Sequence, residues 1–298
     1  MSLLQIKHRT VYRYRQPVTF GEHRLMFRPR DSHDLRHVSS TLSISPKADV
    51  RWKHDVFGNS IAVATFTTGD DELVFDSDVT VEQFAAQWPV FPIAPRGQFL
   101  PVNYTTDERD DLGRSAFRHY PDDDGGLEAW ARSFLSSAGS SDTLSVLRGM
   151  NETINKQFAY VERLDEGTQP PAETLRLKQG SCRDFALLMM EAARTLGIAS
   201  RFVTGYLFDP ADGQGGIRGA GATHAWMQTY LPGSGWIEFD PTNGIVGGNR
   251  LIRVAVTRDP SQAIPITGTF FGAADDFIDL EVDVSVTSVE RAGPASAA

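Results

Sequence analysis

Apolar and polar residues alternate through much of the first 85 positions. The alternating stretches are residues 4–14, 42–44, 61–65 and 79–81. Turn-forming residues separate them at Phe57-Gly58-Asn59 and at Gly69-Asp70-Asp71. A period of two is typical of strands with one buried face, and short strands joined by turns form antiparallel sheets. Residues 1–86 are therefore predicted to form an antiparallel, β-sandwich-like module.

Proline residues interrupt this pattern after residue 86. Four of them lie between residues 87 and 111: Pro89, Pro92, Pro95 and Pro101. Because proline is disfavoured in helix interiors and central strands, this segment is predicted to be a connector. Apolar positions then recur at helical spacing around residues 127–135 and 143–158. They predict the start of a second domain, which we place at residues 112–260.

The segment 261–290 returns to a strand pattern. Its apolar residues alternate with polar ones at Ile278, Leu280, Val282, Val284 and Val286. This alternation predicts one long strand, which could join the sheet of either domain. Small residues dominate positions 291–298, which are predicted to form a disordered tail.

The only cysteine, Cys182, lies at the start of a predicted helix. Ser181 and Asp184 form a typical N-terminal cap, an apolar face follows, and Gly197 stands where helices usually end. The helix macrodipole and the free N–H groups of the first turn would favour a thiolate and could hold an oxyanion. A lone cysteine is often a small buried filler, but the preceding Gly180 permits a sharp turn and close approach of a substrate, which favours a functional role.

A β-hairpin is predicted over residues 223–240. Residues 223–231 and 236–240 alternate like strands, and a proline- and glycine-rich turn joins them. Depending on the register, His224 lies opposite Asp240 or diagonal to it, and either arrangement lets the carboxylate orient the imidazole. The alternative is a strand histidine that meets an acid by chance.

Cys182, His224 and Asp240 together have the chemistry of acyl transfer. The thiolate would attack an acyl carbon, His224 would act as base and then as acid, and Asp240 would fix the histidine tautomer. Tyr160 could supply a second oxyanion donor or anchor a helix end, and it is left out of the predicted site. Trp226 and Trp236 fall on the His224 face of the hairpin, where they could shield the site or pack the core.

Residues 180–207 and 223–244 resemble the core motifs of the transglutaminase-like superfamily, in its bacterial, cysteine-protease-like branch. The resemblance implies an α+β fold, in which the N-terminal antiparallel module precedes a papain-like transglutaminase core. It also implies Cys182 as nucleophile, His224 as base and Asp240 as orienting acid. The chain departs from the family at Leu251-Ile252, where a His-Ile pair is usual, and at Thr257-Arg258-Asp259-Pro260, where a Gly-Arg-Asp-Tyr run is usual.

No cofactor and no metal are expected. The calcium sites of animal transglutaminases lie outside the matched motifs, and no acidic loop has EF-hand spacing. His33 and His37 are four residues apart but have no partners at ligand spacing. The stretch from Gly213 to Gly221 has no phosphate-loop lysine, so it is predicted to be a flap or a plain loop beside the site.

Charge narrows the function classes further. The net charge of −9 argues against nucleic-acid binding, although residues 1–60 carry eleven Lys and Arg against five Asp and Glu. Because no stretch has the apolar character of a signal peptide or a membrane span, we expect a cytoplasmic protein without a membrane partner.

The expected function is thiol-dependent acyl transfer on the amide bonds of a peptide or protein substrate, most simply as a cysteine peptidase or amidase. Protein-glutamine amine transfer would use the same residues, and a non-catalytic peptide-binding module is a further alternative. The sequence does not show whether water or an amine is the acceptor. It also does not show the oligomeric state.

Overall fold

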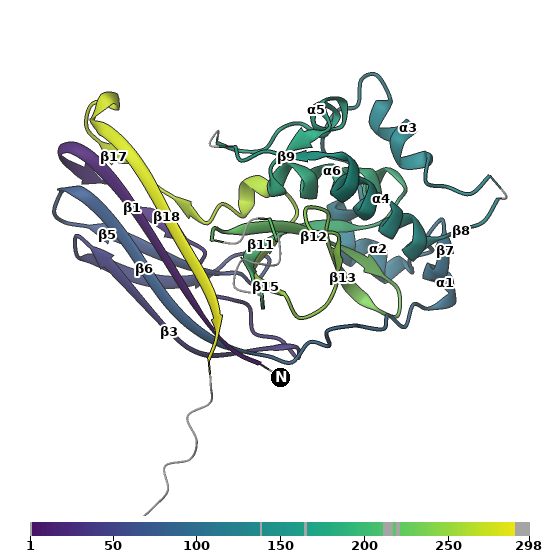
Figure 1. Ribbon diagram of the computed structural model, residues 1–298, viewed down its shortest axis with the longest axis horizontal. Helices are drawn as coiled ribbons and strands as arrows, with labels where there is room; N and C mark the ends of the chain where they lie inside the picture. Colours follow the sequence, from purple (N-terminus) through teal and green to yellow (C-terminus); the bar gives the residue numbers. More distant parts are fainter. Residues whose placement is uncertain (1, 138, 164–165, 211–216, 219–220, 290–298) are drawn as a thin grey trace, which may run out of the picture.

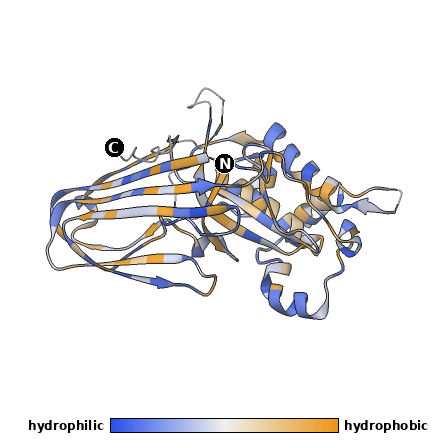
Figure 2. Cartoon of the chain, turned by 90° about the horizontal axis from the view of Figure 1, so that it is seen from below, coloured by the Kyte–Doolittle hydropathy of each residue, from blue (hydrophilic) through white to orange (hydrophobic). Residues whose placement is uncertain are grey.

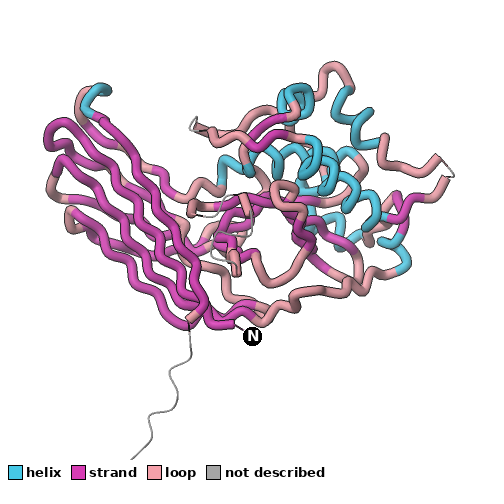
Figure 3. Tube along the Cα trace, viewed as in Figure 1, coloured by secondary structure: helices cyan, strands magenta, loops and turns pink. Residues whose placement is uncertain are grey.

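The computed structural model describes residues 2–137, 139–163, 166–210, 217–218 and 221–289. The chain forms a strand-rich half and a half in which helices cover a second group of strands (Figure 1, Figure 3). This is the predicted α+β fold, with the antiparallel module first. Among the described residues, none of the helices combines the length and the apolar character that a bilayer crossing needs.

Two antiparallel sheets face each other in the N-terminal half. The first has the order β17 (Phe270–Phe271), β1 (Ser2–Phe20), β6 (Asp70–Gln83) and β3 (Leu35–Ser45). The second has the order β16 (Ile266–Thr267), β2 (His23–Leu25), β5 (Ser60–Phe66) and β4 (Ala48–His54). Buried side chains of both sheets, among them Phe20, Leu25, Ala62 and Phe75, form one cluster between them. Apolar and polar positions alternate along these strands (Figure 2), as expected for sheets with one buried face.

The predicted C-terminal strand is β18 (Phe277–Ser288), and it joins the N-terminal module. It pairs with β1 along most of that strand, from Leu4 opposite Ser288 to Tyr14 opposite Phe277. Strand β1 therefore lies between β6 and β18 (Figure 1). The first sheet is built from segments near both ends of the described chain.

The predicted connector contains short elements that sequence analysis missed: α1 (Pro95–Gln98), β7 (Phe99–Leu100) and α2 (Thr106–Leu112). Helix α1 starts with Pro95, because proline is tolerated in the first turn of a helix. The Ala94 N–H donates to the Pro232 carbonyl at 2.7 Å, and the Tyr104 hydroxyl donates to the Tyr230 carbonyl at 2.9 Å. The connector is thus fastened to the predicted hairpin at Ala94 and at Tyr104.

The C-terminal half is built on an antiparallel sheet with the order β14 (Ile245–Val246), β13 (Gly235–Asp240), β12 (His224–Leu231), β11 (Ser200–Leu207) and β15 (Leu251–Thr257). The helices are α3 (Gly126–Arg132), α4 (Thr143–Gln157), α5 (Pro171–Leu177) and α6 (Cys182–Thr195). Short pairings join β8 (Ser141–Asp142) to β7, and β9 (Ala159–Tyr160) to β10 (Gln179–Gly180). Turns of 3-10 helix cover Gly113–Ala116, Pro260–Gln262 and Ala274–Asp276.

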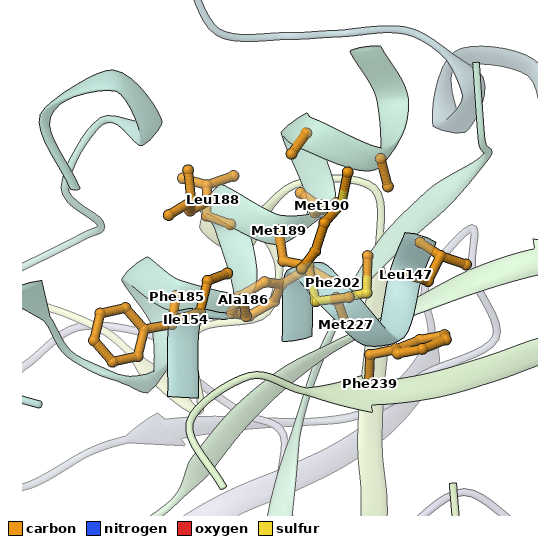
Figure 4. Packing of buried hydrophobic residues seen from close by; sticks show 14 of the residues in the cluster. Leu147, Ile154, Phe185, Ala186, Leu188, Met189, Met190, Phe202, Met227 and Phe239 are labelled. Carbon is orange, nitrogen blue, oxygen red and sulfur yellow. The ribbon is translucent and has the colours of Figure 1, made fainter. Parts of the chain in front are cut away.

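Helix α6 packs on one face of this sheet, where Phe185 and Met189 join Phe202, Met227 and Phe239 in a single buried cluster (Figure 4). Tyr206 of β11 and Ile252 of β15 share a second cluster with residues of β1, β6 and β18, so this end of the core sheet meets the first N-terminal sheet. The face opposite α6 carries a further buried cluster that includes Val203, Trp226 and Val256. The core sheet is therefore covered on both faces, which holds the ends of its strands in fixed positions.

Replacing Phe185 by alanine is expected to destabilise the protein by about 3–5 kcal/mol, the usual cost of truncating a buried phenylalanine. Its side chain is fully buried and contacts the Phe158 ring edge-on, with 5.9 Å between the ring centroids. The free energy of unfolding from urea titration measures this cost. Phe117→Ala is the matched control, because Phe117 is 64% exposed and should change stability little. Equal effects of the two substitutions would contradict the packing described for α6.

Candidate active site

Helix α6 begins at Cys182, as the sequence predicts. Ser181 is the N-cap, and its backbone N–H and its hydroxyl both donate to Asp184 Oδ2 at 2.8 Å. A side chain at Gly180 would place its Cβ 2.9 Å from the Cβ of Asp184, so the chain can enter the helix this closely only with glycine. Cys182 stands half-buried in the first turn, where backbone N–H groups have no partner within the helix. The helix ends at Thr195, and Gly197 follows with φ +76°.

Asp184 does more than cap the helix. Its buried carboxylate also accepts from Arg163 Nη1, at 2.8 and 3.0 Å, and from the Gln169 backbone N–H at 2.7 Å. These bonds tie the segment before α5 to the turn that carries Cys182. Sequence analysis missed this role, because the spacing of 21 residues between Arg163 and Asp184 gives no local signal.

His224 and Asp240 lie on the two strands of the predicted hairpin. The register pairs Met227 with Phe239 and Leu231 with Gly235. Continued by one residue, it puts Asp240 level with Trp226, so His224 is the diagonal neighbour, one of the two registers left open by the sequence. His224 Nε2 lies 2.9 Å from Asp240 Oδ2, and both side chains are buried.

A turn after β13 holds the Asp240 carboxylate in place. The Thr242 N–H donates to its Oδ1 at 2.9 Å, and the Asn243 side-chain amide donates to its Oδ2 at 2.9 Å. Asn243 also exchanges two hydrogen bonds with the backbone of Arg218, at 2.8 and 3.1 Å. Asn155, from α4, donates to the Thr242 carbonyl at 2.7 Å. Asn243 follows the strand end at Asp240 by three residues, but its link to Arg218 has no sequence signal.

These contacts set the charge of the pair. Burial would raise the pKa of Asp240, but the charge of His224 and the hydrogen bonds from His224, Asn243 and Thr242 hold that pKa below its usual value. Burial would likewise lower the pKa of His224. The charge of Asp240 and the hydrogen bond to it outweigh burial, and together with Cys182 they raise the pKa of His224 to about 10. Asp240 is thus an anion beside an imidazolium at neutral pH.

The two ring nitrogens of His224 have different surroundings. Because Nε2 is bound to Asp240, Nδ1 is the nitrogen left for the thiol of Cys182. Within the described chain, Nδ1 makes no hydrogen bond of ordinary geometry, although Cys182 is close enough to raise the pKa of the ring. The imidazole therefore binds the acid through one ring nitrogen, and its other ring nitrogen is left for the thiol.

One of the two hairpin tryptophans lies beside the site. Trp226 is buried, and its ring stacks on His224 with 6.0 Å between the ring centroids, whereas Trp236 lies under Arg201 at the far end of the hairpin. Tyr160 pairs in strand β9 with Gly180, two residues before Cys182. Burial raises the pKa of Tyr160 to about 12, and the charges of Cys182 and Asp240 add to the shift. Tyr160 therefore lies within electrostatic range of the site from which the sequence analysis omitted it.

Two segments match known protein families. Residues 4–82 match the bacterial transglutaminase-like N-terminal region, and residues 128–241 match the transglutaminase-like superfamily. The uncharacterized protein Rv2569c of Mycobacterium tuberculosis is 30% identical over 299 residues, covering 94% of this chain and 91% of that protein.

The chain belongs to the transglutaminase-like superfamily. A further relative, the uncharacterized protein ML0607 of Mycobacterium leprae, is 34% identical over 113 residues, covering 38% of this chain and 40% of that protein. The crystal structure of a "putative cysteine protease" from Cytophaga hutchinsonii has the same fold, with a TM-score of 0.72 and 18% identity, and covers 98% of this chain and 92% of that one.

The superfamily match contains Cys182, His224 and Asp240 and ends one residue after Asp240. Asn243 therefore lies just beyond it. The flap predicted at Gly213–Gly221 lies largely outside the described residues, and so does the tail predicted at 291–298. Within the described residues, no three His, Cys, Asp or Glu side chains gather closely enough to hold a metal ion.

Proposed function

We propose that this protein is a thiol-dependent acyl-transfer enzyme that acts on the amide bonds of a peptide or protein substrate, most simply as a cysteine peptidase or amidase. One observation carries the proposal: His224 is bound to Asp240 through one ring nitrogen and has its other nitrogen available to Cys182, which stands at the N-terminus of α6. This is the arrangement in which an acid, a base and a thiol act in sequence.

In the first half of the reaction, the Cys182 thiolate attacks the carbonyl carbon of the amide. The negative charge moves onto the carbonyl oxygen, which free N–H groups of the first turn of α6 can bind. His224 then gives its Nδ1 proton to the amide nitrogen. The C–N bond breaks, the amine leaves, and the acyl group remains on Cys182 as a thioester.

In the second half, neutral His224 takes a proton from the acceptor, whose oxygen or nitrogen attacks the thioester carbon. The C–S bond breaks, and the thiolate and the imidazolium are restored. Asp240 keeps the imidazole ring oriented and balances its charge in both halves. Water as acceptor gives hydrolysis, and a primary amine gives transfer.

The test is incubation of a glutamine-containing peptide and of a casein digest with the full-length protein, with and without a primary amine, followed by mass spectrometry. A gain of one water at a cleaved bond indicates peptidase activity, and the exchange of side-chain ammonia for water indicates amidase activity. Gain of the amine with loss of ammonia would show amine transfer instead of hydrolysis. An unchanged substrate together with a Cys182 that reacts no faster than a free thiol would overturn the proposal in favour of a binding module.

Asn243→Ala is expected to lower kcat by about tenfold with little change in KM, because a hydrogen bond to a charged acceptor contributes about 1.5–3 kcal/mol. The Asn243 amide holds Asp240 beside His224 and helps to keep the pKa of Asp240 low. Its loss should weaken the pair, so the alkaline limb of the kcat profile should move to lower pH. Asn155→Ala is the control, since Asn155 supports the same turn through the Thr242 carbonyl without contacting Asp240. The same loss and the same pH profile in both variants would assign Asn243 a purely structural role.

A further inference from the structure

Strand β18 borders the first N-terminal sheet and leaves one edge of that sheet open (Figure 1). Within the described residues, its only strand partner is β1. The Val284 N–H points away from β1 and donates to the Gly221 carbonyl at 3.1 Å. Because this direction alternates along a strand, the backbone N–H and C=O groups of Leu280 and Val282 also point to the open edge. These groups are available to a further strand.

The apolar side chains at this edge are exposed, although they lie on the inner face of the sheet. Leu280 and Val282 stand opposite Tyr12 and Thr10 of β1, which are covered, but they are themselves 48% and 39% exposed. Sheet edges are usually protected by lysine, proline, a bulge or a short strand. Strand β18 is 12 residues long, contains no lysine or proline, and has an irregular register only near Phe277. Its apolar edge is therefore suited to pairing.

The outer face of β18 has an excess of negative charge. Asp279 and Asp283 stand opposite Arg13 and Arg9 of β1, and Glu281 also bonds to Arg13. Both arginines are shared with carboxylates of β6, Arg9 with Asp76 and Arg13 with Glu72. Two guanidinium groups thus face five carboxylates, and the next cation along β1, Lys7, faces Asp78. Such a surface favours a partner that carries lysine or arginine.

The same acids argue against a second copy of this chain as the partner. Two β18 strands paired antiparallel would bring Asp279, Glu281 and Asp283 of one copy next to the same residues of the other, on one face of the joint sheet. Like charges opposite each other destabilise a strand pair. The acids therefore disfavour self-association and leave the edge for a basic chain.

The open edge leads toward the candidate site. Gly221, which pairs with Val284, precedes His224 by three residues, so their Cα atoms are at most about 11 Å apart. On the other side of Val284 lies His8 of β1, and its Nδ1 is 2.9 Å from the hydroxyl of Tyr206 on β11. A chain bound along the edge would therefore end near the start of β12, which carries His224.

We propose that the open edge of β18 binds an extended segment of the substrate polypeptide, in which lysine or arginine alternates with apolar residues. The segment adds a strand to the sheet through the backbone of Leu280 and Val282, and its apolar side chains cover theirs. Its cations face Asp279, Glu281 and Asp283. The proposal rests on the acyl-transfer function proposed above, because it names the class of polypeptide that the site at Cys182 would accept.

Titration calorimetry of full-length Cys182→Ala protein tests docking without turnover. The probe is a capped nine-residue peptide of alternating lysine and valine, for which we expect saturable binding with a Kd below about 1 mM. A peptide with the same residues in two blocks, and one of alternating glutamate and valine, should bind more weakly by about tenfold or more. Absence of saturable heat, or equal affinity for all three peptides, would overturn the proposal.

Backbone methylation of the peptide tests strand pairing directly. In an added strand, the N–H groups of alternate residues face β18 and the others face solvent. Methylation of the valine nitrogens and methylation of the lysine nitrogens should therefore differ in their effect on Kd by about tenfold or more. Equal effects would show contact through side chains alone and would overturn the added strand.

Substitutions locate the edge. Val282→Pro removes an N–H that does not bond to β1, and Val282→Lys adds a charge of the kind that protects sheet edges. Each should weaken peptide binding by about tenfold or more. Val38→Lys is the matched control, since Val38 is an exposed valine of β3 at the opposite edge of the same sheet. If Val282→Pro fails to fold, Val282→Lys still decides, and equal weakening by Val38→Lys would overturn the site.

Asp283→Lys tests the charge of the edge. It should weaken binding of the lysine peptide and strengthen binding of the glutamate peptide. Sedimentation of the unmodified protein tests the other occupant. A dimer that dissociates in Val282→Lys would show that a second copy covers the edge and would overturn the proposal.

Turnover separates docking from the acyl-transfer function. A glutamine-containing peptide is joined through one spacer either to the alternating segment or to the block segment. The alternating form should have a KM lower by about tenfold with the same kcat, and Val282→Lys should make the two KM values equal. Binding of the probe with equal KM values in the unmodified protein would overturn the assignment of the bound chain as substrate. Absent binding with intact turnover would overturn docking alone, and binding without turnover of either form would overturn both the substrate assignment and the acyl-transfer function.

Discussion

Replacing Cys182 by alanine is expected to lower amide turnover by on the order of 10⁴-fold or more, because no other group near His224 can form the thioester. Stability should hardly change, since the half-buried thiol stands at a helix end and its removal leaves no large cavity. The thermal midpoint should therefore move by no more than about 3 °C. Turnover by mass spectrometry and the midpoint by calorimetry measure the two effects.

Cys182→Ser is the matched control for this experiment. It keeps a nucleophilic atom and the size of the side chain, but a hydroxyl is a far weaker nucleophile than a thiolate, so turnover should stay low. Full turnover in Cys182→Ala would show that the reaction occurs elsewhere. Loss of the folded state in both variants would instead make Cys182 a packing residue.

Alkylation of Cys182 by iodoacetamide is expected to be about 10- to 100-fold faster at pH 6 than alkylation of a free thiol, whose pKa is about 8.5. Since the pKa of His224 is raised to about 10, the ring stays protonated through neutral pH and loses its charge only as the pH rises through that value. A neighbouring imidazolium favours the thiolate. The measurement is the alkylation rate from pH 4 to 10.

Two variants separate the contributions to this rate. His224→Ala should show a single rise near the pH expected for a free thiol, apart from the small effect of the helix N-terminus, about 0.3–1 kcal/mol. Asp240→Asn should lie between this variant and the unmodified protein at pH 6, because it lowers the pKa of His224 without removing the ring. If the unmodified protein and His224→Ala gave the same profile, there would be no thiolate–imidazolium pair.

Long elements in which apolar residues recur with a strict period were predictable from the sequence. Strands β1 and β18, the hairpin β12–β13 and helix α6 are of this kind. Strand β4 was missed because it lies at a sheet edge and most of its side chains are exposed. Helix α2 was missed because it is short and buries no residue, although its Thr105–Glu108 capping box is present in the sequence.

The candidate site also has a part that was predictable from the sequence and a part that was not. Cys182 is positioned by its own helix, and His224 and Asp240 by one hairpin, so local patterns were enough to single out each element. That the helix and the hairpin belong to one site was implied by the family resemblance. Arg163 supports Asp184, and Asn243 supports Asp240. Both contacts depend on the position of loops that are distant in sequence. A single sequence carries no signal for such contacts, because they follow from tertiary packing.

Strand β1 pairs with β6 and with β18, and the latter pairing joins Ile6 to Val286. During synthesis, β1 and β6 leave the ribosome early, whereas β18 emerges only after all of the C-terminal half. One edge of β1 therefore stays open while that half folds, and an open strand edge invites pairing with other chains. The C-terminal half is in effect an insertion into the first sheet. A nascent or truncated chain that lacks β18 would be the aggregation-prone form of this protein, even with every residue of the candidate site in place.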